Sequence, residues 1–565
     1  MIHRAARATL TASMMAFCEN VRQTASRLTL VLCLGALPAV LAACDDPVRS
    51  TPAAEVQLSA SSPFLAVGDT LRLTAVAKDA SGGTLANPRL SWSSNNDAVA
   101  SVNADGVVRG VSPGKATITA TSGTASGRVE VTVEPPVARV TLEPDTTLVM
   151  VVGNTVELRT PTADAAENAR ARVLAVPRDA SGGVMLGVGL RYASSNEAVA
   201  TVSDAGVVRA VAPGTATITA RAGHGEGRLI VTVERPYTLT YLGTLEGLAQ
   251  SRATGVNELG QVVGYSYPAE SSGAMPAGAR GWIWRNGALT AISLPDTLGL
   301  GASPTVLPSA VNDRGQLAGL AQGSGRNVVF RWEGGSSALA VIPGPRATVS
   351  DLNERGEVVG FWIADFCTRN CTGGGFVFRG GAIDTLSNYG QLRIAPRAIN
   401  DEGQITGALF RVGAGTSWER AVLLESADAD VTYLPTSDVA SHAFDVDNRG
   451  RVVGLDFVGG QFHAFSWSRS AGLSHLGTLP SANISVAIRT SEAGPTVGTS
   501  NCAGCTAALP VLFRNGKVIR IEDLYVQGNW VFEGVADINE RGQIVGHGRH
   551  RTTGATGALL LTPPQ

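Results

Sequence analysis

A seven-fold repeat in the C-terminal half constrains the fold of this 565-residue chain more than any other feature. Most copies contain an asparagine, an acidic residue, any residue and a glycine, followed by a short apolar segment that ends in glycine, as in Asn257–Gly264, while the fifth copy begins Asp447-Asn448. We call the first four residues the marker. The markers begin at Asn257, Asn312, Asn353, Asn400, Asp447, Ser491 and Asn539, and the copy at Ser491 is degenerate. Repeats of this length indicate supersecondary units that must stack on one another to bury their apolar faces.

Each marker is expected to form a tight turn between two strands. Its first side chain can accept a hydrogen bond from the backbone N–H two residues on, and its glycine accepts a left-handed conformation. The functional alternative is calcium binding by these side chains. Each turn supplies too few carboxylates for the oxygen shell that calcium needs, so the structural role is favoured.

Two further strand-like segments lie between markers, one aromatic, such as Trp282–Trp284, and one such as His475–Leu479. Four strands in roughly 47 residues make one blade of a β-propeller. The last copy stops near Thr562, one strand short, whereas Tyr241–Leu245 before the first marker matches His475–Leu479. The segment Tyr237–Leu245 is therefore expected to complete the last blade as its outermost strand, which closes residues 237–565 into seven blades.

Residues 237–565 resemble the HAF-repeat family of extracellular proteins through the triplet His463–Phe465 on an aromatic strand. The resemblance implies a propeller-like domain. The copies are imperfect, and a second triplet, His442–Phe444, lies ahead of a marker and out of register, so it receives no weight.

Residues 55–134 and 138–234 are two copies of another unit. Matching residues of the two copies lie 85 positions apart near the start of the unit and 100 positions apart later. The second copy therefore carries an insertion of 15 residues near Thr160–Arg172, which is expected to form a longer surface loop. The matching segments include Ser94–Val102 with Ser194–Val202, Gly106–Arg109 with Gly206–Arg209, and Pro113–Ala120 with Pro213–Ala220.

Both copies closely resemble bacterial Ig-like domains of group 2, which implies β-sandwiches of the kind that serve as stalks or adhesive modules. Alternating Ala116, Ile118 and Ala120 are expected to face the core. Trp92 and its counterpart Tyr192 are interpreted as packing residues.

The N-terminal residues 1–43 have the parts of a lipoprotein signal peptide, followed by a linker over 44–54. A basic segment precedes the apolar run Leu28–Leu41, which is too short for a comfortable membrane span. The ending Leu41–Cys44 resembles the bacterial lipobox, which implies acylation of Cys44. The alternative is an ordinary signal peptide with an incidental cysteine. We expect a lipid-anchored envelope protein, at the outer membrane or cell surface.

Charge and composition bear on the partners and on the fold class of the chain. The chain has 45 Lys+Arg against 47 Asp+Glu, which argues against a nucleic-acid partner. Val- and Thr-rich runs between Gly, Asn, Asp and Pro predict an all-β protein of two Ig-like sandwiches and a seven-bladed propeller. No cofactor or metal is expected, and the protein is expected to be a monomer.

Four cysteines fall in equivalent loops of the third and sixth blades, namely Cys367, Cys371, Cys502 and Cys505. Export to an oxidising compartment favours two local disulfides. A zinc site would need all four thiolates together, which loops on non-adjacent blades disfavour. A redox role for Cys502 and Cys505 is also disfavoured, because no thioredoxin-like pattern surrounds them.

Longer connections are expected on the face opposite the markers, where binding residues usually lie. Aromatic platforms there suit sugar rings or peptide side chains; packing within the loops is the alternative. The candidate binding face comprises Tyr267, Trp362, Arg369, Trp418, Trp530, His547, Arg549 and His550.

Enzyme motifs such as the nucleophile elbow, the zinc-protease helix and the phosphate loop are missing from the sequence. The prediction is a non-catalytic surface protein whose propeller binds a carbohydrate or protein ligand. The alternatives are an envelope-tethered hydrolase or lyase and a purely structural role. Asp351, Asp445 and Asp537, on presumed inner strands, could line a channel. Clustered acids at its mouth would favour an enzyme, whereas an aromatic or basic loop face would favour binding.

Overall fold

The computed structural model describes residues 52–143, 147–164, 168, 171–270, 276–333, 336–340, 347–364, 372–386, 392–411, 419–480, 482–502 and 507–565. Their regular elements are β-strands, with 3-10 turns at η1 (Asp296–Leu298) and η2 (Ile521–Asp523), so the predicted all-β class is confirmed. None of the helices in this part of the chain has the length and apolar character to cross a bilayer. The chain forms two compact units, Met1–Glu134 and Pro135–Gln565.

The first unit contains an Ig-like sandwich of nine strands. Sheets β2-β9-β8-β5 and β3-β7-β6 enclose the core, and β1 pairs with β4. Ala116, Ile118 and Ala120 are buried there as predicted. Gly106 has φ +74°, and a side chain on it would meet the ring of Trp92, so Trp92 is a packing residue. The strands are β1 (Glu55–Ser59), β2 (Phe64–Ala66), β3 (Thr70–Arg72), β4 (Thr74–Lys78), β5 (Ser91–Ser94), β6 (Ala100–Val102), β7 (Val107–Gly110), β8 (Gly114–Ser122) and β9 (Ala125–Glu134).

The second unit begins with the other Ig-like sandwich. Its sheets have the orders β10-β13-β12-β16-β15 and β11-β18-β17-β14. Tyr192 takes the place of Trp92 and packs against Gly206. The strands are β10 (Arg139–Glu143), β11 (Thr147–Val151), β12 (Thr155–Arg159), β13 (Val173–Arg178), β14 (Arg191–Ser194), β15 (Ala200–Val202), β16 (Val207–Ala210), β17 (Gly214–Ala222) and β18 (Gly225–Glu234).

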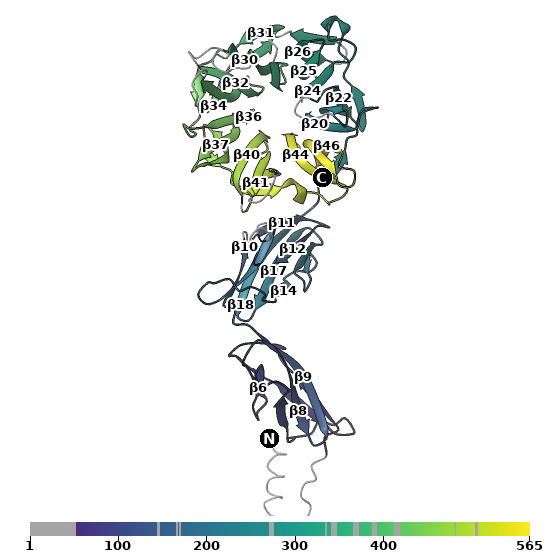
Figure 1. Ribbon diagram of the computed structural model, residues 1–565, viewed down its shortest axis with the longest axis vertical. Coiled ribbons are helices and arrows are strands. Elements are labelled where there is room, and N and C mark those ends of the chain that lie inside the picture. Colours follow the sequence, from purple (N-terminus) through teal and green to yellow (C-terminus); the bar gives the residue numbers. More distant parts are fainter. Residues whose placement is uncertain are drawn as a thin grey trace, which may run out of the picture. The chain divides into compact units, whose positions relative to one another are not determined.

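Seven four-stranded antiparallel sheets follow and surround a common centre (Figure 1). In every blade the strand that precedes the marker is innermost. Blades one to three are β20 (Gln250–Val256), β21 (Val262–Tyr267), β22 (Arg280–Arg285), β23 (Ala288–Ala291); β24 (Thr305–Val311), β25 (Leu317–Gly323), β26 (Arg326–Glu333), β27 (Ser336–Ala340); and β28 (Ala347–Leu352), β29 (Val358–Ala364), β30 (Thr372–Arg379), β31 (Ala382–Thr385).

Blades four to six continue the same pattern along the chain. They are β32 (Leu392–Ile399), β33 (Ile405–Arg411), β34 (Glu419–Leu424), β35 (Val431–Tyr433); β36 (Ser441–Val446), β37 (Val452–Val458), β38 (Gln461–Ser468), β39 (Gly472–His475); and β40 (Ala482–Thr490), β41 (Thr496–Cys502), β42 (Leu509–Arg514), β43 (Lys517–Arg520).

Blade seven joins the two ends of the propeller. Strands β44 (Trp530–Ile538), β45 (Ile544–His550) and β46 (Thr556–Thr562) come from the C-terminal end, and β19 (Thr238–Tyr241) pairs with β46 as the outermost strand. The register runs from Thr238 opposite Thr562 to Tyr241 opposite Leu559. This confirms the predicted closure, which leaves no open edge between the first and last blades.

Candidate functional site

The markers form a hydrogen-bonded ring around one end of the propeller centre. In five blades the first marker side chain donates through Nδ2 to the backbone carbonyl of the next marker, as from Asn257 to Asn312 (2.8 Å). Asn539 donates to Asn257 (2.9 Å) and so links the last blade to the first. The other donors are Asn312, Asn353 and Asn400. These side chains are buried, so the ring is part of the structure that holds the blades together.

The local turn differs in one detail from the expectation. The Oδ1 atom of Asn257 accepts from the backbone N–H of Gln261, four residues on rather than two (2.8 Å). Three residues separate Asn257 from Gln261, and the marker turn brings the start of the next strand back beside Asn257. Among the described markers, the two-residue bond occurs at Asp447, which accepts from the N–H of Arg449 (3.0 Å). The marker glycines have positive φ, as predicted, for example +75° at Gly260.

The second marker residues form what we call the acidic rim. A carboxylate of one blade accepts the backbone N–H of the neighbouring blade, as Glu354 does from Asp313 (2.7 Å) and Asp313 does from Glu258 (2.8 Å). The amide of Asn448 fills the position in blade five and accepts from Asp401. The rim comprises Glu258, Asp313, Glu354, Asp401, Asn448, Glu492 and Glu540.

Every inner strand contains a β-bulge just before its marker, which shifts the register there. A bulge re-aims the neighbouring side chains. The residues two positions before the marker are Gly255, Ala310, Asp351, Ala398, Asp445, Arg489 and Asp537. Four of the seven blades therefore place a charged residue at one level of the propeller centre.

Three aspartates surround the single arginine at this level. The Nε atom of Arg489 lies 3.8 Å from Oδ1 of Asp537. Each aspartate also accepts a hydrogen bond from a backbone N–H of the following blade in the ring. Asp445 accepts from Thr490 (2.7 Å), Asp351 from Ile399 and Asp537 from Val256. The carboxyl groups thus join neighbouring inner strands and share one guanidinium.

Burial changes the protonation of this cluster. It raises the pKa of Asp445 to about 7 and that of Asp537 to about 6, although Arg489 acts in the opposite direction. Burial also raises the pKa of Asp351. Burial alone would lower the pKa of Arg489, but the three carboxylates outweigh it and raise that pKa. The guanidinium therefore stays charged, while Asp445 and Asp537 titrate well above the usual pKa range of a carboxyl group.

The rim and the charged cluster line one cavity of 410 Å³, which we call the channel mouth. Ten carboxyl groups and one guanidinium, that of Arg489, border it. The acids are Glu258, Asp313, Asp351, Glu354, Asp401, Asp445, Asp447, Glu492, Asp537 and Glu540. In the described part of the chain, no group of three or more His, Cys, Asp or Glu side chains has the arrangement to hold a metal ion.

Sequence reasoning placed Asp351, Asp445 and Asp537 on inner strands, and the structure shows that they line the channel mouth. It missed Arg489, although this residue stands two positions before the degenerate marker at Ser491, in the same register as the aspartates. The common register was the signal that could have identified it.

The aromatic candidates for the opposite face pack against their own blades. Tyr267 is buried, Trp362 stacks on Phe376 (5.7 Å between ring centroids), and Trp530 stacks on Tyr241 (4.5 Å). They lie in blades one, three and seven and are not brought together into one platform. Their role in ligand binding stays a prediction.

Three of the four basic candidates of that face, His547, Arg549 and His550, lie on β45. His550 meets the edge of the Trp530 ring (5.1 Å), and Arg549 forms an ion pair with Glu533. Burial lowers the pKa of His547 to about 4, so its imidazole is neutral at neutral pH. Arg369 and Trp418 lie outside the described residues.

The cysteine predictions remain open. Cys44, Cys367, Cys371 and Cys505 lie outside the described residues. Cys502 ends β41, but its side chain also lies outside the described part. Both disulfides and the lipid anchor therefore stay predictions.

Comparison with known proteins identifies the Ig-like segments. The family described as bacterial Ig-like domain (group 2) matches residues 52–133 and 187–233, which confirms the predicted resemblance for those segments. No curated protein matches the chain. The HAF-repeat resemblance of residues 237–565 stays a prediction.

Solved structures similar to this chain include both S-layer and propeller proteins. Domains 4 and 5 of the S-layer protein SbsC are 22% identical, over 32% of this chain and 98% of that chain, with a TM-score of 0.15. Domains 1–6 of the same protein are 16% identical over 60% of this chain, which spans 41% of that structure, with a TM-score of 0.15. The β-propeller domain of the Trilobed protease from Pyrococcus furiosus is 11% identical, over 55% of this chain and 91% of that chain, with a TM-score of 0.35.

Proposed function

We propose that this protein is a non-catalytic, lipid-anchored protein of the cell surface whose propeller recognises a protein ligand through lysine or arginine side chains. The observation that carries the proposal is the channel mouth, where ten carboxyl groups face one guanidinium. A concave site with one sign of charge concentrates ligands of the opposite sign and speeds their association. A cavity of 410 Å³ accommodates several side chains.

The acidic rim supplies fixed acceptors for such a ligand. Glu258 and Glu354 each use one carboxylate oxygen to accept a backbone N–H from a neighbouring blade. The other oxygen of each carboxylate makes no hydrogen bond within the described residues. Because the first bond fixes the carboxylate, an ammonium or guanidinium group can bind the second oxygen with little further loss of side-chain entropy.

The remaining domains support display rather than chemistry. The Ig-like repeats resemble domains suited to stalks, and the sequence predicts a lipid anchor at Cys44 before them. The three aspartates of the charged cluster are committed to inter-blade hydrogen bonds, which restrains the movement that a general acid or base needs.

The test is titration of the full chain with a fluorescent tetralysine peptide, with tetraglutamate as the ligand control. We expect binding of tetralysine only, weakening as salt is added. The double variant Glu258→Gln/Glu354→Gln keeps the acceptors for the backbone but removes two charges, and should lower affinity roughly tenfold, or about 1.4 kcal/mol. The exposed Glu197→Gln in the second Ig-like domain is the matched control.

Equal binding of both peptides, or unchanged affinity in the double variant, would contradict recognition of cationic side chains at this mouth. Circular dichroism of the double variant establishes that the propeller remains folded.

A second candidate, a hydrolase or lyase, is favoured by one observation: Asp445 has a pKa of about 7 inside the cavity, where a carboxylic acid could donate a proton. Incubation of the full chain with peptide and polysaccharide mixtures, followed by mass spectrometry, tests it. Cleavage products that disappear with Asp445→Asn would establish this candidate and displace the binding proposal.

A further inference from the structure

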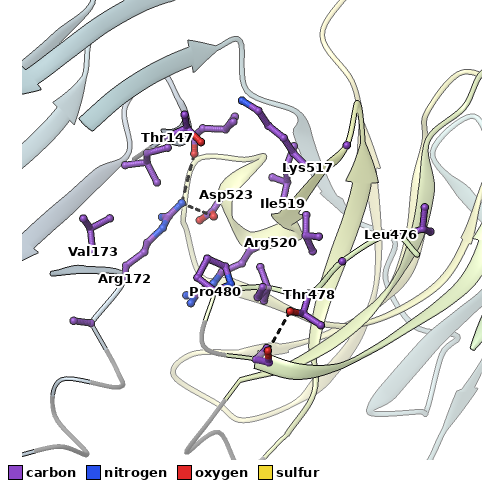
Figure 2. Close-up of a pocket in the computed structure, with 18 residues that line it drawn as sticks. Thr147, Arg172, Val173, Leu476, Thr478, Pro480, Lys517, Ile519, Arg520 and Asp523 are labelled. Carbon is purple, nitrogen blue, oxygen red and sulfur yellow. Dashed lines mark hydrogen bonds and ion pairs between the residues drawn. The ribbon is translucent and has the colours of Figure 1, made fainter. Parts of the chain in front are cut away.

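A second cavity, of 560 Å³, lies between the second Ig-like domain and the propeller, within one compact unit (Figure 2). One wall comes from β11 and the residues before β13. The other comes from the connection between blades five and six and from β43 and η2 of blade six. None of its lining residues belongs to the channel mouth or to the candidate binding face.

The second Ig-like domain and the propeller are held together by side-chain and backbone contacts. Arg172, at the end of the insertion predicted as a surface loop, forms an ion pair with Asp523 of the propeller. Asn154 donates to the carbonyl of Tyr525 (3.0 Å), and Arg514 pairs with Glu234 (2.6 Å). The ion pair of Arg172 with Asp523 thus joins the two walls of the cavity, and the other two contacts hold the domains together beside it.

Positive charge exceeds negative charge in this cavity. Arg172, Lys517 and Arg520 line it, and the single acid among the lining residues, Asp523, is already paired with Arg172. Within the described residues, the side chains of Arg520 and Lys517 have no hydrogen bond or ion pair. Figure 2 shows these residues around the same space.

The lining also suits a small ligand in size and shape. The connection Leu476–Pro480 supplies apolar surface and backbone groups beside the cations. Cavities of several hundred Å³ with a few convergent polar groups are typical of small-molecule sites. A planar guanidinium such as that of Arg520, which forms no hydrogen bond or ion pair within the described residues, matches the paired oxygens of a carboxylate or phosphate.

We propose that this cavity binds an oxyanion, a carboxylate or phosphate on a small molecule, with Arg520 as the principal ligand-binding residue and Lys517 as a second cation. Arg172 joins the two walls through its ion pair with Asp523 and contributes positive electrostatic potential. Two sources share this chemistry, acidic sugars and phosphate esters. The site is independent of the channel mouth, whose charge has the opposite sign.

Isothermal titration of the full chain with glucuronate and with inorganic phosphate tests the proposal. We expect one-to-one binding of at least one anion, at least tenfold weaker with Arg520→Gln and several-fold weaker with Lys517→Gln. Arg209→Gln, an exposed arginine on β16, is the matched control and should bind as the wild type does. Binding should weaken from about 0.05 M to about 0.5 M salt.

The outcomes separate the sources and can overturn the site. Binding of glucuronate alone supports an acidic sugar, binding of phosphate alone supports a phosphate ester, and binding of both supports their common oxyanion chemistry. Failure of both anions to bind, or unchanged affinity in Arg520→Gln, would overturn the proposal. If Arg520→Gln fails to fold, the exposed Lys517→Gln variant decides.

Discussion

At the scale of single residues, the charged cluster of the channel mouth determines how the propeller responds to pH. Asp445 faces Arg489, Asp351 and Asp537, so one guanidinium serves three carboxyl groups. Ionising all three would leave uncompensated negative charge on side chains that are largely removed from water, which is costly. The folded protein therefore retains protons that the unfolded chain would release.

This proton retention predicts that stability falls as the pH rises. The pKa of Asp445 is raised from 3.8 to about 7 by burial, so its contribution is fully present below about pH 4 and is lost as the pH approaches 7. At about 1.4 kcal/mol per pKa unit, the loss is on the order of a few kcal/mol. Asp445→Asn should flatten the pH dependence of the free energy of unfolding, measured in urea, whereas the exposed Asp204→Asn should not. An unchanged slope in Asp445→Asn would show that its carboxyl group does not titrate in this range.

The same residues show how far a sequence can predict a site. The three aspartates could be assigned to inner strands because each stands just before a marker and the repeat fixes which strand precedes it. The pairing of Arg489 with Asp537 joins consecutive blades, but it depends on how the inner strands of different blades face one another, which the local sequence does not specify. Tyr267, a candidate for the binding face, is buried, and residue type alone does not distinguish a binding platform from a packing residue.

At the scale of elements, the marker is both a turn and a connector between blades. The turn was predictable because Asn, acid and Gly in fixed order have local conformational preferences. The donation from Asn257 to the next marker was not, because it joins residues 55 positions apart in the chain. Blade five uses a different pair: Asp447 binds Arg451, whose guanidinium donates to the carbonyls of Ser491 and Gly494.

Because Asp447 and Arg451 replace the Asn–Gln pair of other blades, the effects of substitutions at these two positions on stability should be coupled. Asp447→Asn removes the carboxylate that orients Arg451, and Arg451→Gln leaves the buried Asp447 carboxylate without its cation, so each single variant should lose about 2–4 kcal/mol. The double variant recreates the Asn–Gln pair of Asn400 and Gln404 and should lose at least about 1 kcal/mol less than the sum. Urea unfolding of the four proteins measures this coupling, and strictly additive losses would mean that the two positions act separately.

At the scale of the whole propeller, closure depends on a strand from the N-terminal end of the propeller segment. The sequence predicted this strand because Tyr241–Leu245 repeats a segment of blade five and blade seven lacks one strand. The contact between the second Ig-like domain and the propeller was not predictable in the same way. Its Arg172–Asp523 pair involves an insertion that has no counterpart in the first copy, so no repeat defined its partner.

Closure predicts that β19 is essential for a soluble propeller. The chain 247–565 lacks β19 and should expose the edge of β46, together with the apolar surface that Leu242 and Leu245 cover. Burial of each leucine contributes about 1.5–3 kcal/mol, so this chain should aggregate or melt well below the matched chain 236–565, which keeps the strand. Calorimetry and light scattering compare the two. Equal melting temperatures and solubility would show that blade seven is stable with three strands and that β19 serves only to connect the propeller to the domain before it.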